Sequence, residues 1–247
     1  MEDRFIGILQ ARMGSSRLPG KSLMELYGFP LLELILHRLK NLNVERLWIA
    51  TTHLEEDDVI ANLGERLGLP VLRGDSRDVL SRFLSILDLN PAEWVIRFTG
   101  DNPLIHHETS NLLIEAARDA LDVDYISDFV SNRYPIGALP EAVKSERLYK
   151  LSEISMPSHH RSHVTSHIWQ SGLRTSPIKL PGRYREHPEW RWTLDEPSDL
   201  KFFQEVGEQF GAKVIDAGFV ELSNFLEGRP EIVRINQDVK QKNISEG

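Results

Sequence analysis

Two kinds of apolar run alternate along the first half of the chain: short continuous runs, and longer runs whose apolar residues recur with helical spacing. Short continuous runs are typical of buried strands, and helical spacing is typical of the helices that cover them. Strands that alternate with helices predict a three-layer α/β/α sandwich around a mostly parallel sheet. The predicted strands are Phe5–Gln10, Arg46–Thr51, Pro70–Leu72 and Trp94–Thr99, and the predicted helices are Pro30–Leu42, Glu55–Leu67, Asp78–Leu87 and His107–Leu121.

The alternation of strands and helices stops after Tyr125. Six prolines interrupt residues 128–189, so we expect this segment to form an inserted arm rather than another strand–helix repeat. Regular patterning returns with a predicted strand at Trp190–Leu194 and a predicted helix at Pro197–Phe210. We therefore expect one domain over residues 1–228, followed by a polar and frayed tail over residues 229–247.

Composition and charge argue against several classes of function. The net charge of −8 argues against a nucleic-acid partner, which usually requires a basic face. The chain has no cysteine, so disulfides, thiolate metal ligands and cysteine nucleophiles are excluded. The first apolar run is too short for a secretory signal, and no run reaches membrane-spanning length. We expect a cytoplasmic protein with no membrane partner.

A loop rich in glycine, serine and basic residues follows the first predicted strand and spans Gln10–Lys21. Backbone N–H groups, hydroxyls and fixed positive charge at the carboxyl end of a strand are the groups that bind a polyphosphate, so a nucleotide is the first ligand to consider. The loop narrowly fails the P-loop pattern, because Gly14 and Gly20 enclose five residues where that motif has four. The simpler alternative is a basic surface turn.

Two aspartates come directly after predicted strands. Asp101 follows Thr99-Gly100, and Asp195 precedes a helix that a proline opens. Magnesium at nucleotide sites typically takes one or two carboxylates together with phosphate oxygens, so both aspartates are candidate ligands. The alternative is that each one caps the turn or helix that follows, which is the interpretation we favour for Asp199.

These motifs occur in an order that resembles one family. The segments are Ile8–Lys21, Arg73–Asp75 with Asp78–Leu80, Thr99–Leu104, Tyr134–Gly137 with Glu141, and Leu194–Pro197. In this order they resemble the cytidylyltransferases of the spore-coat polysaccharide type, over about Phe5 to Leu200. Those proteins are similar to the synthetases that make CMP-activated sialic, pseudaminic, legionaminic and 3-deoxy-octulosonic acids. The resemblance implies the nucleotide-diphospho-sugar transferase fold and a CTP-dependent nucleotidyltransferase that is a homodimer.

The resemblance also implies roles for individual residues. The triphosphate of CTP would be held by Arg12, Ser15, Ser16, Arg17 and Lys21, and the rest of the nucleotide would lie near Gln10, Ala11, Gly14 and Gly100. Magnesium would be bound by Asp101 and Asp195, and the acceptor would lie near Gly137, Glu141 and His163. Of these residues, the implied catalytic set is Arg12, Lys21, Asp101 and Asp195.

The implied reaction is attack of an acceptor hydroxyl on the α-phosphorus of CTP. It would transfer CMP to an acidic sugar for polysaccharide or glycan biosynthesis and release pyrophosphate. Positioning and electrostatics dominate such chemistry, so no protein nucleophile is needed. Three alternatives stay open: a nucleotidyltransferase for another nucleotide or a non-sugar acceptor, a catalytically silent nucleotide-binding module, and a P-loop kinase.

A histidine-rich stretch lies in the expected arm, at residues 159–167. His163 and His167 are four residues apart and would share a helix face, which is a spacing compatible with zinc. Packing or a dimer contact is the interpretation we favour, with His163 kept as a candidate contact for an acidic sugar. The chain has Ser162 where the resembling family has glutamate, which weakens any transfer of acceptor specificity.

Overall fold

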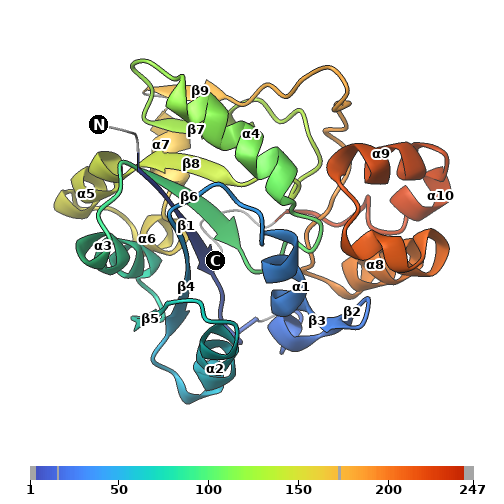
Figure 1. Ribbon diagram of the computed structural model, residues 1–247, viewed down its shortest axis with the longest axis horizontal. Coiled ribbons are helices and arrows are strands. Elements are labelled where there is room, and N and C mark those ends of the chain that lie inside the picture. Colours follow the sequence, from blue (N-terminus) through green and yellow to red (C-terminus); the bar gives the residue numbers. More distant parts are fainter. Residues whose placement is uncertain (1–3, 16, 172–173, 242–247) are drawn as a thin grey trace.

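A seven-stranded sheet with helices on both faces forms the centre of the protein (Figure 1). The computed structural model describes residues 4–15, 17–171 and 174–241. The strand order in the sheet is β5-β4-β1-β6-β8-β7-β9. The predicted three-layer α/β/α sandwich with a mostly parallel sheet is confirmed.

The parallel half of the sheet is the part that the apolar pattern predicted. β1 (Phe5–Gln10) lies between β4 (Arg46–Thr52) and β6 (Trp94–Thr99), and β5 (Val71–Gly74) pairs with the outer side of β4. The last residue of β1 lies opposite the last residue of β6. Because parallel strands end at one edge of a sheet, the loops that follow β1, β4 and β6 gather there.

The other half of the sheet comes partly from the segment that we expected to be an arm. β8 (Glu141–Lys144) runs antiparallel to β6, β7 (Tyr125–Ser127) runs antiparallel to β8, and β9 (Thr175–Pro177) pairs with β7. Residues 128–189 therefore leave the parallel strand–helix repeat, as expected. They are nevertheless built into the sheet, because β8 pairs with residues 94–97 of β6 on one side and with β7 on the other.

Alternate residues of β1 supply two cores, one on each face. Phe5 and Leu9 pack into the first core, and Ile6 and Ile8 pack into the second. The first core takes side chains from α1 (Leu31–Arg38), α2 (Asp58–Arg66), α4 (His107–Arg118), α8 (Pro197–Phe210) and α9 (Phe219–Glu227). The second takes them from α3 (Val79–Leu89), α5 (Ser145–Glu153) and α7 (Ser166–Ser171), and α6 (Ser158–His163) contacts α3.

Short elements complete the chain. The 3₁₀ helix η1 (Lys21–Leu23) and the hairpin of β2 (Glu25–Leu26) and β3 (Phe29–Pro30) connect β1 to α1. The other 3₁₀ helices are η2 (Glu55–Asp57), η3 (Asp128–Val130) and η4 (Ala212–Ile215). Within the described residues, no helix is both long and apolar enough to cross a membrane.

Residues 190–194 do not form the predicted strand. The segment is extended, but its pairing is limited to one isolated bridge between Ile136 and Arg191. The N–H of Trp192 belongs to this bridge and donates to the carbonyl of Ile136 at 2.7 Å, whereas the N–H of Leu194 donates to the carbonyl of Asp101 at 2.7 Å. The segment therefore crosses the carboxyl edge of the sheet and binds loops there.

The segment that we expected to be a frayed tail is ordered as far as it is described. α10 (Pro230–Val233) packs against α8 and α9, and Ile232 and Asn236 are buried. The three helices α8, α9 and α10 lie together at one side of the sheet (Figure 1). The polar composition of residues 229–241 therefore hides a packed segment, whereas residues 242–247 lie outside the described part.

Candidate active site

A cavity of about 500 Å³ opens at the carboxyl edge of the parallel strands. The opening loop and the ends of β1 and β6 form one side of it, and segments around residues 127–141 and 162–163 form the other. The predicted residues that line it are Gln10, Ala11, Arg12, Gly14, Ser15, Arg17, Lys21, Gly100, Asp101, Gly137, Glu141, His163 and Asp195. Ser16 lies outside the described residues. The structure thus brings the predicted nucleotide, metal and acceptor residues to one cavity.

The first turn of the site depends on the close approach of two strand ends. The N–H of Gly100 donates to the carbonyl of Gln10 at 2.9 Å, which extends the β1–β6 ladder into the loops. A Cβ at Gly100 would lie 3.0 Å from Cβ of Ala11, so the neighbouring loop would have to move. Glycine at position 100 therefore allows the loop after β6 to lie against Ala11 of the opening loop.

Lys21 places its ammonium between the two candidate metal ligands. Its Nζ lies 3.0 Å from Oδ1 of Asp195 and 3.3 Å from Oδ2 of Asp101, and it also donates to the carbonyl of Leu194 at 3.0 Å. Burial alone would lower the pKa of Lys21, but the two carboxylates raise it above its ordinary value. Lys21 is therefore a fixed positive charge at the meeting point of the two aspartates.

Asp101 is oriented by the end of its own strand. Thr99 Oγ1 donates to Oδ1 of Asp101 at 2.6 Å, and Asn102 Nδ2 donates to Thr99 Oγ1 at 2.9 Å. The carbonyl of Asp101 accepts from the Thr193 hydroxyl at 3.2 Å. The side chain and the backbone of Asp101 are thus both fixed, and Oδ2 faces Lys21.

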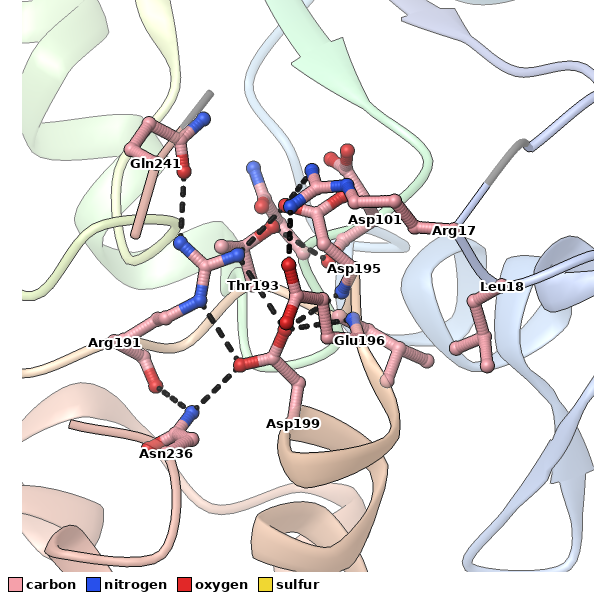
Figure 2. A network of polar contacts seen from close by, with 12 residues as sticks. Arg17, Leu18, Asp101, Arg191, Thr193, Asp195, Glu196, Asp199, Asn236 and Gln241 are labelled. Carbon is pink, nitrogen blue, oxygen red and sulfur yellow. Dashed lines mark hydrogen bonds and ion pairs between the residues drawn. The ribbon is translucent and has the colours of Figure 1, made fainter. Parts of the chain in front are cut away.

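Asp195 is surrounded by three cations. Its Oδ2 accepts from Arg191 Nη2 at 2.7 Å and lies 3.1 Å from Arg17 Nη2 (Figure 2). Its Oδ1 accepts from Lys21 Nζ at 3.0 Å. Arg17 also pairs with Glu196 at 3.1 Å. Burial alone would raise the pKa of Asp195, but Lys21, Arg17 and Arg191 together hold it below its ordinary value. Asp195 is therefore ionised at neutral pH.

The donor set fits a divalent cation on a nucleotide. Asp101 and Asp195 converge on a single point, and that point already accommodates a cation, the ammonium of Lys21. The described residues contain no group of three or more histidine, aspartate or glutamate side chains arranged to hold a metal. Two carboxylates alone leave most of a magnesium coordination shell to other oxygens, which phosphates and water supply at nucleotide sites.

Arg12 differs from the other cations of the loop in the acceptor that it contacts. Its Nη1 donates to the carbonyl of Ser76 at 3.2 Å, which is a neutral acceptor, whereas Arg17 and Lys21 contact carboxylates. Ser22 Oγ donates to the carbonyl of Arg12 at 3.0 Å and holds the backbone of the loop. Arg12 therefore brings positive charge to the cavity wall that no carboxylate offsets in these contacts.

The opposite end of the cavity contains a buried acid, Glu141. Its carboxylate accepts from Arg97, from Tyr125 at 2.5 Å and from Thr165 at 2.5 Å. Arg97 Nε also donates to Oε1 of Gln10 at 3.0 Å. The side chain of Glu141 is thus already satisfied by three donors, so it supports the cavity wall, and Gln10 and Glu141 are connected through one guanidinium.

Gly137 and His163 also line this end of the cavity. Gly137 has φ +88°, and a Cβ there would lie 2.8 Å from the carbonyl oxygen of Trp192 and 2.8 Å from Oδ1 of Asn102. Burial, and then the nearby Arg97, lower the pKa of His163 below its ordinary value, so its imidazole is neutral at neutral pH. His163 can exchange hydrogen bonds with a hydroxyl, but it does not bring a positive charge.

The other histidines of the stretch at residues 159–167 contact one another. His160 Nδ1 lies 2.7 Å from the hydroxyl oxygen of Ser166, and the His160 and His167 rings are 5.2 Å apart edge to face. The His159 ring is 4.3 Å from the His160 ring. These contacts place the stretch in the packing between α6 and α7.

Sequence reasoning missed the support behind Asp195. Asp199, which we assigned to the start of a helix, does form a capping box with Glu196 in α8, but it is fully buried and also binds Arg191 at 2.9 Å. Asn236 and Gln241 complete this network from the far end of the chain. The acidic helix start was the available signal for Asp199, whereas no pattern marked Asn236 or Gln241.

Comparisons with known proteins identify relatives of this chain. The family model of the cytidylyltransferases matches residues 6–212. An uncharacterized protein of Methanocaldococcus jannaschii is 33% identical over 98% of this chain and 98% of its own length. The spore coat polysaccharide biosynthesis protein SpsF of Bacillus subtilis is 31% identical over 91% of this chain and 94% of its own. A 3-deoxy-manno-octulosonate cytidylyltransferase of Syntrophobacter fumaroxidans is 30% identical over 56% of this chain and 54% of its own.

A solved structure shows the same fold over nearly the whole chain. The cytidylyltransferase of Leptospira borgpetersenii superposes with a TM-score of 0.84 at 21% identity, and the match covers 98% of this chain and 100% of that one. The resemblance drawn from the motifs is confirmed, and with it the expectation of a nucleotidyltransferase enzyme. The protein belongs to the cytidylyltransferase family.

Proposed function

We propose that this enzyme transfers CMP from CTP to a hydroxyl of an acidic sugar of the ulosonic type and releases pyrophosphate, as a step in polysaccharide or glycan biosynthesis. The observation that carries the proposal is the position of Lys21 between Asp101 and Asp195, beside a basic loop at the carboxyl edge of the sheet. This arrangement joins two carboxylates for a divalent cation with positive charge for a triphosphate.

The metal in the proposal is magnesium, held by Asp101 and Asp195. Bound there, it would offset the negative charge that develops on the phosphoryl oxygens during transfer. Asp195 stays ionised because the three neighbouring cations lower its pKa against the effect of burial. Asp101 keeps one oxygen toward the cavity because Thr99 occupies the other. Both carboxylates are therefore prepared to bind a cation.

The opening loop would bind the triphosphate and stabilise the leaving pyrophosphate. Arg12, Arg17 and Lys21 all line the cavity, and their fixed charges act where negative charge accumulates. Lys21 would exchange its carboxylate partners for phosphate oxygens when the nucleotide and the metal bind. The backbone of Gln10 and Ala11 would approach the base, and Arg97 fixes the Gln10 side chain next to it.

The acidic sugar is supported by the relatives, which include a 3-deoxy-manno-octulosonate cytidylyltransferase and the SpsF protein. The acceptor would lie against Gly137 and His163 at the far end of the cavity. A neutral His163 suits a sugar hydroxyl better than a carboxylate. The carboxylate of the acceptor would then be offset by the cations of the nucleotide side.

The proposal also includes a homodimer and a cytoplasmic location, both of which rest on the family resemblance. Light scattering of the purified protein at several concentrations tests the dimer. A single species with the mass of one chain, 28.3 kDa, would contradict it.

The decisive experiment offers CTP, ATP, GTP and UTP with Mg²⁺ to a panel of ulosonic acids and neutral sugars, and follows products by mass spectrometry. We expect a CMP–sugar acid conjugate and pyrophosphate from CTP, and no conjugate with the Asp101→Asn variant. Conjugates from another nucleotide, or with a non-acidic acceptor alone, would replace this assignment with a related nucleotidyltransferase. Binding of CTP without turnover of any acceptor would favour a silent nucleotide-binding module.

A further inference from the structure

Residues 236–241 reach the candidate active site through a network of polar contacts, which is buried around Asp199 and Asn236 (Figure 2). Gln241 lines the cavity, and its Oε1 accepts from Arg191 Nη1 at 2.7 Å. Asn236 is buried, and its Nδ2 donates to Oδ1 of Asp199 at 2.9 Å and to the carbonyl of Arg191 at 3.1 Å. Both residues lie beyond residue 212, where the match to the family model ends.

Arg191 connects this segment to the candidate metal ligand. Three of its nitrogens have different partners: Nη1 binds Gln241, Nε binds Asp199 at 2.9 Å, and Nη2 binds Oδ2 of Asp195 at 2.7 Å. A guanidinium is planar and its donors form a rigid fork, so fixing two of its edges also fixes the third. The position of Gln241 and Asp199 therefore sets where Arg191 presents its charge to Asp195.

Asp199 fixes the same aspartate through the backbone. Its Oδ2 accepts from the N–H groups of Asp195 and Glu196, each at 2.9 Å, while Oδ1 accepts from Arg191 and Asn236. The backbone of Asp195 and one of its carboxylate oxygens are thus both held from behind. The other oxygen, Oδ1, is directed toward Lys21.

We propose that Asn236 and Gln241 are positioning residues for the metal-binding carboxylate of Asp195. By locking Arg191 and Asp199, they keep Oδ2 of Asp195 occupied and present Oδ1 to the cation in the cavity. Partners of this kind around metal ligands change metal affinity or activity by about 10- to 100-fold when they are removed. The inference rests on the proposed function, because it requires a metal at Asp195.

A variant of Gln241 is the most direct test, because the residue is exposed and removal of its side chain leaves no buried cavity. We expect Gln241→Ala to raise the half-saturating concentration of Mg²⁺ in CMP transfer by about 3- to 10-fold. This increase is smaller than the usual effect, because Gln241 acts on Asp195 only through Arg191. The KM for CTP at saturating Mg²⁺ should change less than twofold. Gln241→Glu keeps an acceptor for Arg191, so its half-saturating concentration of Mg²⁺ should equal that of the wild type.

A binding measurement separates this effect from turnover. Mn²⁺ is titrated into the full-length protein with CTP and without acceptor, and free Mn²⁺ is followed by electron paramagnetic resonance. We expect Gln241→Ala to weaken Mn²⁺ binding by the same factor that it raises the Mg²⁺ requirement, with an unchanged melting temperature. Lys240→Ala, at the neighbouring exposed position, is the matched control and should bind Mn²⁺ like the wild type.

The outcomes distinguish this inference from the proposed function. If the wild type binds Mn²⁺ no better than Asp195→Asn, both the metal site and the inference are wrong. If the wild type binds Mn²⁺ and transfers CMP but Gln241→Ala matches Lys240→Ala in both assays, the function stands and the inference is overturned. Asn236→Asp, which sets a further carboxylate against Asp199, should weaken Mn²⁺ binding more than Gln241→Ala does.

Discussion

Lys21 and Asp195 form an ion pair with 3.0 Å between Nζ and Oδ1, and the same ammonium lies 3.3 Å from Oδ2 of Asp101. The cation that the two carboxylates share in the structure is therefore part of the chain. Under the proposed function, binding of magnesium and CTP exchanges this cation for another and moves Lys21 to the phosphates. Lys21 would therefore pair with the carboxylates in the free enzyme and with the triphosphate in the complex.

Replacement of Lys21 by methionine should lower kcat by about 10²- to 10³-fold, the usual cost of losing one group that stabilises developing charge. The KM for CTP should also rise, because the triphosphate loses a charged partner. Pyrophosphate release at varied CTP measures both constants. Lys201→Met removes an exposed lysine from α8 and is the control; an equal loss in both variants would contradict the role of Lys21.

Replacement of either candidate metal ligand by asparagine should cut turnover by about 10³-fold, because the developing charge on the phosphates would lose its divalent partner. The two variants should differ in stability. Asp195→Asn leaves Arg17 and Arg191 facing an uncharged group in a buried setting, whereas Asp101 is more exposed. Thermal unfolding and pyrophosphate release are measured on both variants.

We expect a lower melting temperature for Asp195→Asn than for Asp101→Asn. Equal melting temperatures would mean that the cations around Asp195 do not depend on its charge. Turnover close to that of the wild type in either variant would remove that residue from the metal site.

Glu141→Gln should lower the free energy of unfolding by about 3 kcal/mol, because it leaves the buried Arg97 without its counter-ion. Chemical denaturation measures the loss, and Glu146→Gln, in an exposed pair with Lys150, is the control that should stay near the wild type. A variant that keeps its stability but has a higher KM for the acceptor would instead support direct contact of Glu141 with the sugar.

Gly137→Ala should destabilise the protein by about 1–3 kcal/mol and reduce turnover. Position 137 has φ +88°, which strains any residue with a Cβ, and the new methyl would press on the carbonyl of Trp192. Because Trp192 lies three residues before Asp195 in the segment 190–194, the displacement should reach the site. Gly182→Ala has no atom within 4 Å of the added Cβ and should behave like the wild type in denaturation and activity assays.

Acid should destabilise the protein through His106, whose pKa is lowered to about 3, mainly by burial and then by Arg38. Below the ordinary histidine pKa of about 6.5, the unfolded chain binds a proton that the folded chain does not. The free energy of unfolding should therefore fall with pH between about 6.5 and 3, by up to about 1.4 kcal/mol per pH unit from this group.

The comparison for His106 is the His106→Asn variant, since asparagine keeps a side-chain acceptor at the N-cap of α4. Urea denaturation at pH 7, 6 and 5 should show a smaller loss of stability in this variant than in the wild type. Parallel pH dependences of the two proteins would show that His106 does not titrate as proposed.

The parallel half of the fold and its edge could be predicted from apolar patterning. β1, β4 and β6 are short and mostly buried runs, and parallel strands end at one edge, so the meeting of the basic loop and Asp101 follows from this pattern. The presence of Asp195 in the same site could be predicted only from the order of the family motifs. It lies almost a hundred residues after Asp101, and no periodicity connects the two.

Other parts of the fold could not be predicted from the sequence pattern, and each has a physical reason. Residues 190–194 alternate like a strand, but their N–H groups find acceptors in the loops after β6 and β7 instead of in a neighbouring strand. β8 has only four residues and pairs antiparallel inside a proline-rich segment. Gln241 lies in a polar stretch whose composition predicts a tail, and its contact with Arg191 joins side chains fifty residues apart.

The position of Gln241 also affects how the protein can be handled. An affinity tag joined shortly after Gln241 would begin close to a side chain that lines the cavity. The amino-terminal side is the better choice, because Arg4 precedes the start of β1 and the cavity lies at the strand's other end. Immobilisation on the amino-terminal side of β1 should leave the cavity open to its ligands.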